Sequence, residues 1–216
     1  MAGRTLVTAL LLACGFAWGQ ASQRNINFEL LAAARTGNVA SVAALIDQGA
    51  SPNARNRLGD TPLNTAARSG NLEMVRLLLA RKADVDQPNL SRVTPLMSAA
   101  FGGHEAIVRE LISHKADVSP ADRVHKTAMV YAAGNGGPGC VQALLDAGVD
   151  PNQRDAEGAT ALMWAAAYGK VDNLRLLLSR GAEVNSRDAR GKSALAIATE
   201  QEQEEAARLL REAGAQ

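Results

Sequence analysis

The stretch that decides the fold is residues 61–89, which read TPLNTAARSGNLEMVRLLLARKADVDQPN. Thr61 is a good N-cap because a hydroxyl accepts hydrogen bonds from the free N–H groups of a first helical turn, and Pro62 fits the next position, where no N–H is needed. Gly70 can adopt the left-handed conformation that ends a helix. Apolar residues then recur at helical spacing on one face. The stretch therefore predicts two short antiparallel helices followed by an extended turn.

The same pattern returns along the chain with a period of 33 residues. Threonine opens most copies, paired alanines follow it, and a leucine-rich run comes after the next glycine. Self-similarity at a period of roughly 20 to 50 residues is the signature of a solenoid, in which each unit buries its apolar face against its neighbours. One apolar column runs without insertion through Leu30, Leu63, Leu96, Met129, Leu162 and Leu195.

The period and the T-P-L word followed by alanines resemble the ankyrin repeat, and the resemblance extends over about residues 25–215. It implies an all-α ankyrin-repeat solenoid of about six helix-turn-helix units with β-turn fingers. It also implies that partners bind in the concave groove of the inner helices and on the finger tips. The expected units are residues 25–57, 58–90, 91–123, 124–156, 157–189 and 190–216.

Some units depart from the common pattern. Lys82 and Lys115 stand where other units have a helix-ending glycine, and a left-handed residue with a side chain costs about 1 kcal/mol. The first unit lacks the T-P-L word, and the last has Glu202 in place of the recurrent turn glycine within the acidic run 200–205. Terminal units have one face without a neighbour, so we interpret both as solvated caps.

Residues 1–19 are expected to be a signal peptide rather than part of the fold. Arg4 is the single charge before an uncharged, mostly apolar run over residues 5–17, which is shorter than the roughly 20 residues of a spanning helix. Cleavage is expected before Gln20, with Ser22 as the alternative.

The export signal leaves the final location open. Residues 20–24 are expected to be a short linker, and a second interpretation makes Cys14 the lipidated first residue of a lipoprotein. In either case the repeats lie outside the cytoplasm, and we expect them in the periplasm, with secretion as the alternative. The mature chain is expected to be monomeric and to have no membrane span.

Charge and cysteine content exclude several classes of protein. Removal of the leader takes away Arg4 and no acid, which lowers the formal charge from +1 to zero and leaves no basic footprint for nucleic acid. Only Cys140 then remains, so stability must come from packing rather than from an internal disulfide.

Candidate catalytic and ligand-binding motifs each have a structural explanation. Residues 134–139 form a G-x-G-x-x-G word, but they align with the turn between two helices, with Pro138 starting the second, and not with a strand-to-helix nucleotide site. The spacing of His104, His114 and His125 matches no metal-ligand pattern. We interpret Cys140 as a packed thiol, and we expect no cofactor and no enzymatic activity.

Aromatic residues make up only 3% of the chain, so their positions are informative. Phe101, Tyr131, Trp164 and Tyr168 fall in the inner helices of the third to fifth units, and Tyr131 and Trp164 occupy the same repeat position. Aromatic anchors dominate protein interfaces, which predicts a binding surface here. The alternative is that Tyr131 and Trp164 fill the core between units.

The fingers supply the other candidate contacts. Each begins with Asn or Asp, a turn former, and we interpret Asp122, Asp155 and Asp188 as structural. The residues that follow vary between units, and variation within a repeat marks positions that the fold does not dictate. The predicted partner-binding residues on the fingers are Arg57, Leu58, Leu90, Arg123, Lys126, Glu157 and Arg190.

The sequence thus predicts an exported bacterial protein that binds another protein in the cell envelope. Resemblance to small exported ankyrin proteins of bacteria implies protection or assembly of envelope partners. A secreted effector that binds a host protein is the first alternative, and an enzyme is the second.

Overall fold

The computed structural model describes residue 23 and residues 25–216. The expected signal peptide, its cleavage positions and Cys14 lie outside the described residues. The first helix covers residues 25–35. The others, in chain order, are α2 (Val39–Asp47), α3 (Pro62–Ser69), α4 (Leu72–Ala80), α5 (Pro95–Phe101), α6 (Glu105–Ser113), α7 (Ala128–Gly134), α8 (Pro138–Asp146), α9 (Ala161–Ala167), α10 (Val171–Ser179), α11 (Ala194–Glu200) and α12 (Glu204–Glu212).

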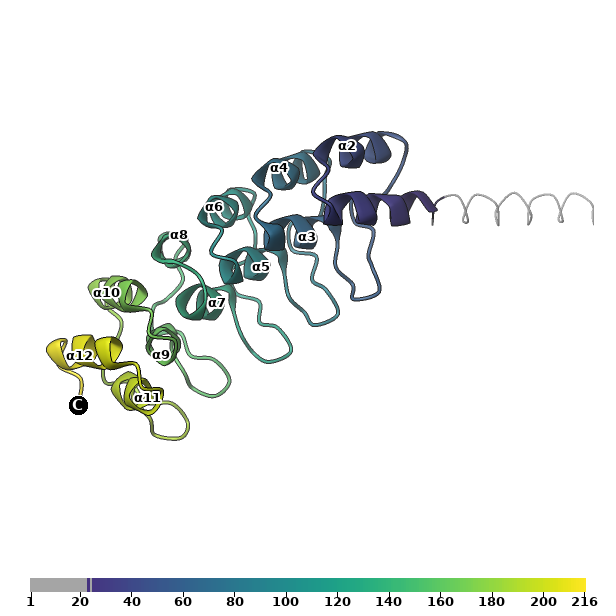
Figure 1. Ribbon diagram of the computed structural model, residues 1–216. Coiled ribbons are helices and arrows are strands. Elements are labelled where there is room, and N and C mark those ends of the chain that lie inside the picture. The colour runs from purple at the N-terminus through teal and green to yellow at the C-terminus, as the bar shows by residue number, and fades with distance from the viewer. Residues whose placement is uncertain (1–22, 24) are drawn as a thin grey trace, which may run out of the picture.

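The helices form two parallel rows, as Figure 1 shows. The outer row contains the even-numbered helices, and the inner row contains the helix over residues 25–35 and the odd-numbered helices, beyond which the fingers project. Each inner helix packs on the next and on its own outer helix. The predicted all-α solenoid of helix-turn-helix units is confirmed. Within the described part of the chain, no helix is both long enough and apolar enough to cross a membrane.

The predicted helix caps are present in every unit after the first. A hydroxyl at each inner-helix N-cap accepts from the backbone N–H three residues later, and at Thr61 the side chain of Asn64 completes a capping box. Gly70 ends α3 with a φ of 76°, in the left-handed region. Lys82 and Lys115 are left-handed as predicted, with φ of 62° and 65°. The capping hydroxyls belong to Thr61, Thr94, Thr127, Thr160 and Ser193.

The core runs the length of the array. In the apolar column that revealed the repeat, the first five members are at most 3% exposed. Leu195, the sixth, lies in the last described unit and is only partly buried. The alanine pairs of the inner helices, such as Ala99 and Ala100, are fully buried, and their small size lets successive inner helices approach closely. The G-x-G-x-x-G word is an inter-helix turn, as predicted: α7 ends at Gly134 and α8 begins at Pro138.

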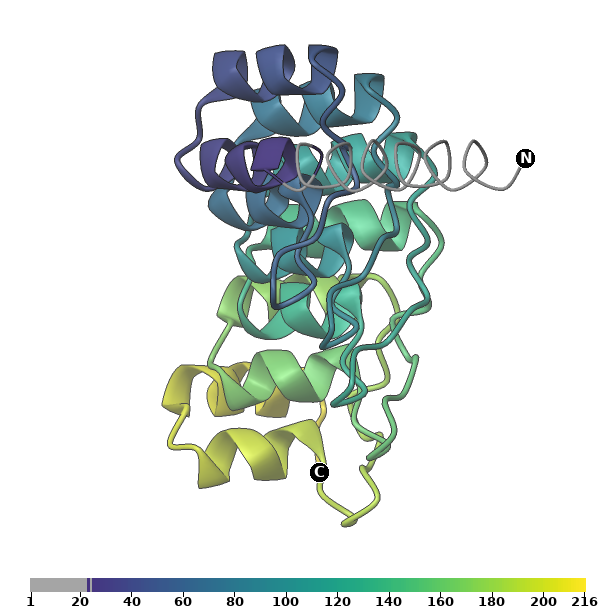
Figure 2. The same cartoon turned by 90° about the vertical axis from the view of Figure 1, so that its right-hand side faces the viewer.

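The fingers line up on one side of the array, which Figure 2 shows edge on. Backbone hydrogen bonds join the tips of neighbouring fingers: Leu90 N–H donates to the Leu58 carbonyl at 3.0 Å, and Arg123 N–H donates to the Ser91 carbonyl at 3.1 Å. A similar bond joins Ala189 to Glu157 at 2.9 Å. These bonds join the first three fingers to one another and the last two to each other. We call the surface formed by the fingers and the inner helices the finger face.

Candidate partner-binding surface

Four aromatic rings meet on the finger face in two pairs. Phe101, at the end of α5, meets Tyr131 edge to face, with ring centroids 5.7 Å apart and an interplanar angle of 85°. Trp164 stacks on Tyr168, with centroids 6.3 Å apart and an angle of 18°. These are the geometries that the quadrupoles of aromatic rings favour. Phe101 remains 52% exposed and Tyr168 47% exposed, so half of each outer ring is open to solvent.

Lys126 connects the two pairs. Its Nζ lies 4.3 Å from the centroid of the Trp164 ring and 5.9 Å from that of the Tyr131 ring. An ammonium group within about 6 Å of a ring centroid is attracted by the electron-rich face of the ring. Lys126 and the four rings therefore form one continuous surface across three units, which we call the aromatic cluster.

The polar tips of the two central rings fix the cluster to the fingers. The Tyr131 hydroxyl donates to Asp122 Oδ2 at 2.6 Å, and Trp164 Nε1 donates to Asp155 Oδ2 at 2.9 Å. Burial, followed by the hydrogen bond to Asp122, raises the pKa of Tyr131 above its usual range. Both rings are half-buried, so they pack between units and also contribute to the surface. The core and groove interpretations of these two rings thus each hold in part.

Gly134 leaves space for the ring of Tyr168. A Cβ at Gly134 would lie 3.1 Å from the Tyr168 ring, closer than almost all real Cβ contacts. The preceding unit has Phe101 at the position of Gly134, and that ring turns toward Tyr131 instead. The repeat position that carries the Phe101 ring in the third unit therefore carries Gly134 in the fourth, where it leaves space for the Tyr168 ring of the fifth.

The aspartates that begin the fingers are structural, as the sequence indicated. Asp122 is 3% exposed and accepts hydrogen bonds from the backbone N–H groups of Val124 and Lys126, both at 2.9 Å. Asp155 and Asp188 accept equivalent bonds in their own fingers. Each carboxylate closes its finger from inside, so it is not available to a partner.

A comparison with protein families agrees with this architecture. The family model described as ankyrin repeats in three copies matches four overlapping stretches, residues 2–89, 30–122, 83–155 and 129–216. The chain belongs to the ankyrin-repeat family. Ankyrin repeats are modules of protein–protein interaction, and the family is typically not enzymatic. A comparison with curated proteins gave no match.

The predicted finger contacts of this ankyrin domain fall into two groups. Arg190 is exposed, but its guanidinium bonds Asp188 Oδ2 at 2.9 Å within its own finger. Burial of Asp188 opposes ionisation, but the backbone N–H of Lys192 and the guanidinium of Arg190 outweigh it and lower the pKa of the carboxyl. The remaining exposed contacts are Arg57, Leu58, Leu90, Arg123 and Glu157, with Lys126 half-buried beneath them in the aromatic cluster.

Sequence reasoning missed two finger-tip residues, Arg92 and His125. Both are exposed and left-handed, with φ of 63° and 62°. Glycine occupies the equivalent positions Gly59, Gly158 and Gly191. The signal was therefore present in the sequence as a glycine column interrupted twice, because a left-handed position ordinarily selects glycine.

Two further structural contacts also went unpredicted. Arg55 and Arg154 share a repeat position, and each guanidinium bonds a backbone carbonyl in its own finger and another in the next finger. Asn173 is 1% exposed in α10, and its Nδ2 donates to the Ala133 carbonyl of the preceding unit at 2.8 Å. From the second unit onward, the column of Asn173 otherwise holds Met74, Ile107, Cys140 and Ala206, so a polar residue among apolar ones was the available signal.

The histidines and the cysteine have ordinary structural surroundings. The His104 ring lies against Gly70 and Gly102 and bonds the Arg68 carbonyl through Nε2 at 3.1 Å, so it supports the turn between helices. Cys140 is 1% exposed, and burial raises its pKa to about 11, which keeps the thiol protonated. In the portion of the chain that the structure describes, no three His, Cys, Asp or Glu side chains are grouped to hold a metal ion.

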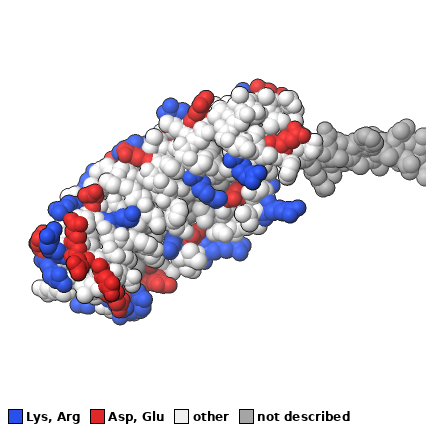
Figure 3. All heavy atoms as spheres, in the orientation of Figure 1, with Lys and Arg blue, Asp and Glu red and all other residues white. Residues whose placement is uncertain are grey.

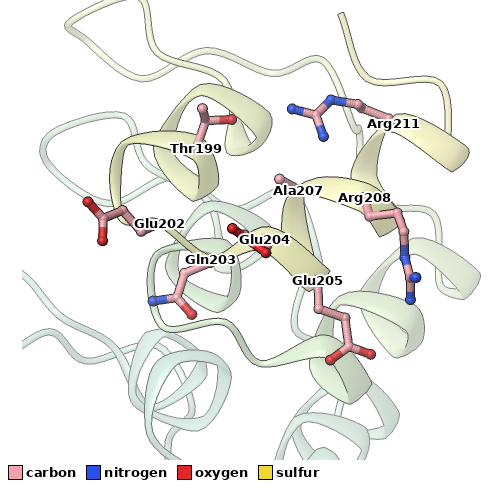
Figure 4. Close-up of a pocket in the computed structure, with 8 residues that line it drawn as sticks. All are labelled: Thr199, Glu202, Gln203, Glu204, Glu205, Ala207, Arg208 and Arg211. Atoms are coloured by element: carbon pink, nitrogen blue, oxygen red, sulfur yellow. The ribbon is translucent and has the colours of Figure 1, made fainter.

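A hollow lies at the C-terminal end of the array, away from the aromatic cluster. It encloses about 780 Å³ and is open to solvent where a following unit would pack. Figure 4 shows that its charged side chains spread in different directions instead of converging on one point. This arrangement matches a solvated cap. The lining residues are Thr199, Glu202, Gln203, Glu204, Glu205, Ala207, Arg208 and Arg211.

Proposed function

We propose that this ankyrin protein is exported and binds a partner protein in the bacterial cell envelope through its finger face. The observation that carries the binding part is the aromatic cluster, in which half-exposed rings and a lysine lie side by side on one surface. Interface hot spots are enriched in such anchors. The charge and apolar pattern of residues 1–19 supports the export part.

The two outer rings of the aromatic cluster, Phe101 and Tyr168, are more exposed than the stacking of the units requires. Phe101 and Tyr168 leave about half their surface in water, whereas the leucines that join the units are fully buried. Together with exposed Leu58, Leu90 and Val124 on the finger tips, they account for most of the large apolar side chains that the described domain exposes. A soluble protein rarely exposes a contiguous apolar surface without a partner for it.

The test is capture of a partner from envelope extract by the purified protein after chemical cross-linking. The double variant Phe101→Ala, Tyr168→Ala removes the two most exposed rings of the cluster, and Phe28→Ala removes a ring that is 71% exposed in the first helix. We expect a specific protein that is captured by the wild type and by Phe28→Ala and lost with the double variant. Undiminished capture by a correctly folded double variant would show that the aromatic cluster does not hold the partner.

Location is tested separately by fractionating cells that express the full chain. We expect a processed form in the periplasmic fraction. A labelled lipid on the processed protein would assign it to the membrane as a lipoprotein, and its appearance in the medium or in host cells would favour a secreted effector.

A further inference from the structure

The first three fingers expose positive charge and almost no negative charge. Arg57, Arg92 and Arg123 are exposed at the tips of the fingers over residues 56–60, 89–93 and 122–126. Among the described residues, none of their guanidinium groups makes an ion pair or a side-chain hydrogen bond. They differ in this from Arg55 and Arg154, whose guanidinium groups are bonded to backbone carbonyls.

The carboxylates of these fingers are buried and already paired. Asp60 is 3% exposed and bonds Arg68 at 3.1 Å and Asn89 Nδ2 at 2.8 Å. Asp122 is equally buried and bonds its own finger and Tyr131. Figure 3 shows a dense group of red atoms at the C-terminal end of the array. Exposed Asp84 and Asp117 lie in the loops that lead into the second and third fingers, outside the tips themselves. The unbalanced charge on these three fingers is therefore positive.

Two of these fingers hold a strained residue that presents a side chain to solvent. Arg92 and His125 adopt the left-handed conformation that glycine provides in the other fingers. The fold gains nothing from either side chain, since Arg92 and His125 make no side-chain hydrogen bond among the described residues. A strained, exposed residue whose side chain makes no structural hydrogen bond points to a role in binding.

Apolar side chains alternate with these cations along the row. Leu58, Leu90 and Val124 are 67%, 55% and 66% exposed, one on each finger. Backbone hydrogen bonds tie the three tips into one line, from Leu58 to Leu90 and from Ser91 to Arg123. In the described structure no backbone bond continues the line to the finger over residues 155–159, and that finger carries Glu157. The basic row therefore ends at the aromatic cluster.

We propose that this row binds an acidic, extended segment of the partner protein. Its carboxylates pair with Arg57, Arg92 and Arg123, and its apolar side chains contact Leu58, Leu90 and Val124 on the way to the aromatic cluster. Charge complementarity carries the assignment, because three finger tips that expose arginines and bury their own carboxylates repel a basic partner segment and attract an acidic one. The inference rests on the proposed binding function and specifies the chemistry of the partner.

The test is selection from a random peptide display library against the full chain. We expect the enriched peptides to be rich in Asp and Glu with interspersed apolar residues. Their affinity, measured by fluorescence anisotropy, should fall at least about tenfold in the double variant Arg57→Glu, Arg123→Glu, and should weaken with added salt. The matched control Arg175→Glu, Arg208→Glu makes the same charge change on exposed residues of α10 and α12 and should leave the affinity within about twofold.

The other outcomes separate this inference from the proposed function. Enriched peptides without acidic bias, bound equally by the finger variant and lost only with Phe101→Ala, Tyr168→Ala, would overturn the inference and leave the binding surface in place. Failure to enrich any peptide would also overturn it, because a linear segment would then not suffice, while capture of a folded partner from envelope extract would still support the proposed function.

Discussion

The outer helices and the finger face of this solenoid use their side chains differently. On the outer helices, Leu111, Leu144 and Leu177 are fully buried between units. The charges on the surface of these helices are paired from unit to unit: Arg76 bonds Glu110 at 2.8 Å, and Arg180 bonds Asp146 at 3.1 Å. On the finger face, by contrast, three arginines make no side-chain bond within the described chain, and two rings are half in water. The stacking of the units accounts for the side chains of the outer helices, but not for the half-exposed rings of the finger face or for these three arginines, which are unpaired in the described chain.

This difference separates residues that the stacking of the units requires from residues that it does not require. A residue that the stack requires is buried, capped or paired with the neighbouring unit. Arg92 and His125 meet none of these needs and oppose the backbone preference of their positions, and Phe101 and Tyr168 leave about half of their surface in water. Substitutions on the two sides should therefore move different quantities: stability on the outer helices and partner affinity on the finger face.

The largest expected effect on stability comes from truncation of an outer-helix leucine. Leu144→Ala removes a fully buried side chain from α8 and should lower the free energy of unfolding by about 3 kcal/mol, because it leaves a cavity between units. The matched finger variant, Leu90→Ala, affects a side chain that is 55% exposed and should change stability by about 0.5 kcal/mol or less while reducing partner capture. Urea unfolding followed by circular dichroism measures both. Equal losses of stability in the two variants would remove the distinction between the two sides.

Sequence reasoning predicted the repetitive part of this contrast well. The caps from Thr61 onward, the left-handed Lys82 and Lys115, and the structural role of Asp122 all follow from local rules that act within one unit. The position of Lys126 over the Trp164 ring could not be predicted, since it depends on how a finger of one unit meets the inner helix of the next. Contacts of that kind are set by the stacking geometry and not by the period.

Other parts of the surface were visible in the repeat but required a comparison of columns. Arg92 and His125 interrupt a column of glycines, and Asn173 interrupts a column that is apolar in the other units after the first. The pairing of Arg190 with Asp188 was hidden for a different reason: a finger arginine looks the same in sequence whether it folds back or points outward. The sequence pattern does not predict the conformation of an exposed side chain.

A smaller effect, of opposite sign, is expected at the tip of the third finger. His125→Gly should raise the free energy of unfolding by about 0.5–1 kcal/mol, because glycine relieves the left-handed strain and loses only part of that gain to its greater freedom in the unfolded chain. Thermal unfolding measures the change. His114→Gly is the control, since His114 has a φ of −89° at the end of α6, where glycine brings no relief and should destabilise. A loss of stability in His125→Gly would mean that the imidazole supports the finger, and the argument from strain would fail.

The smallest expected effect concerns Asp188, which holds the guanidinium of Arg190 within its own finger. Hydrogen bonds from Lys192 N–H and from Arg190 hold the pKa of Asp188 below its ordinary value despite burial. A depressed folded pKa stabilises the protein above the unfolded pKa, and this contribution is lost as the pH falls through the folded value. The melting temperature of the wild type should therefore exceed that of Asp188→Asn at neutral pH, and the difference should shrink as the pH is lowered below about 4.

Asp172→Asn, an exposed change in the first turn of α10, is the control and should show no comparable pH-dependent difference. A pH-independent gap for Asp188→Asn would mean that ionisation of Asp188 does not hold Arg190, and Arg190 would then join Arg57 and Arg123 among the arginines open to a partner.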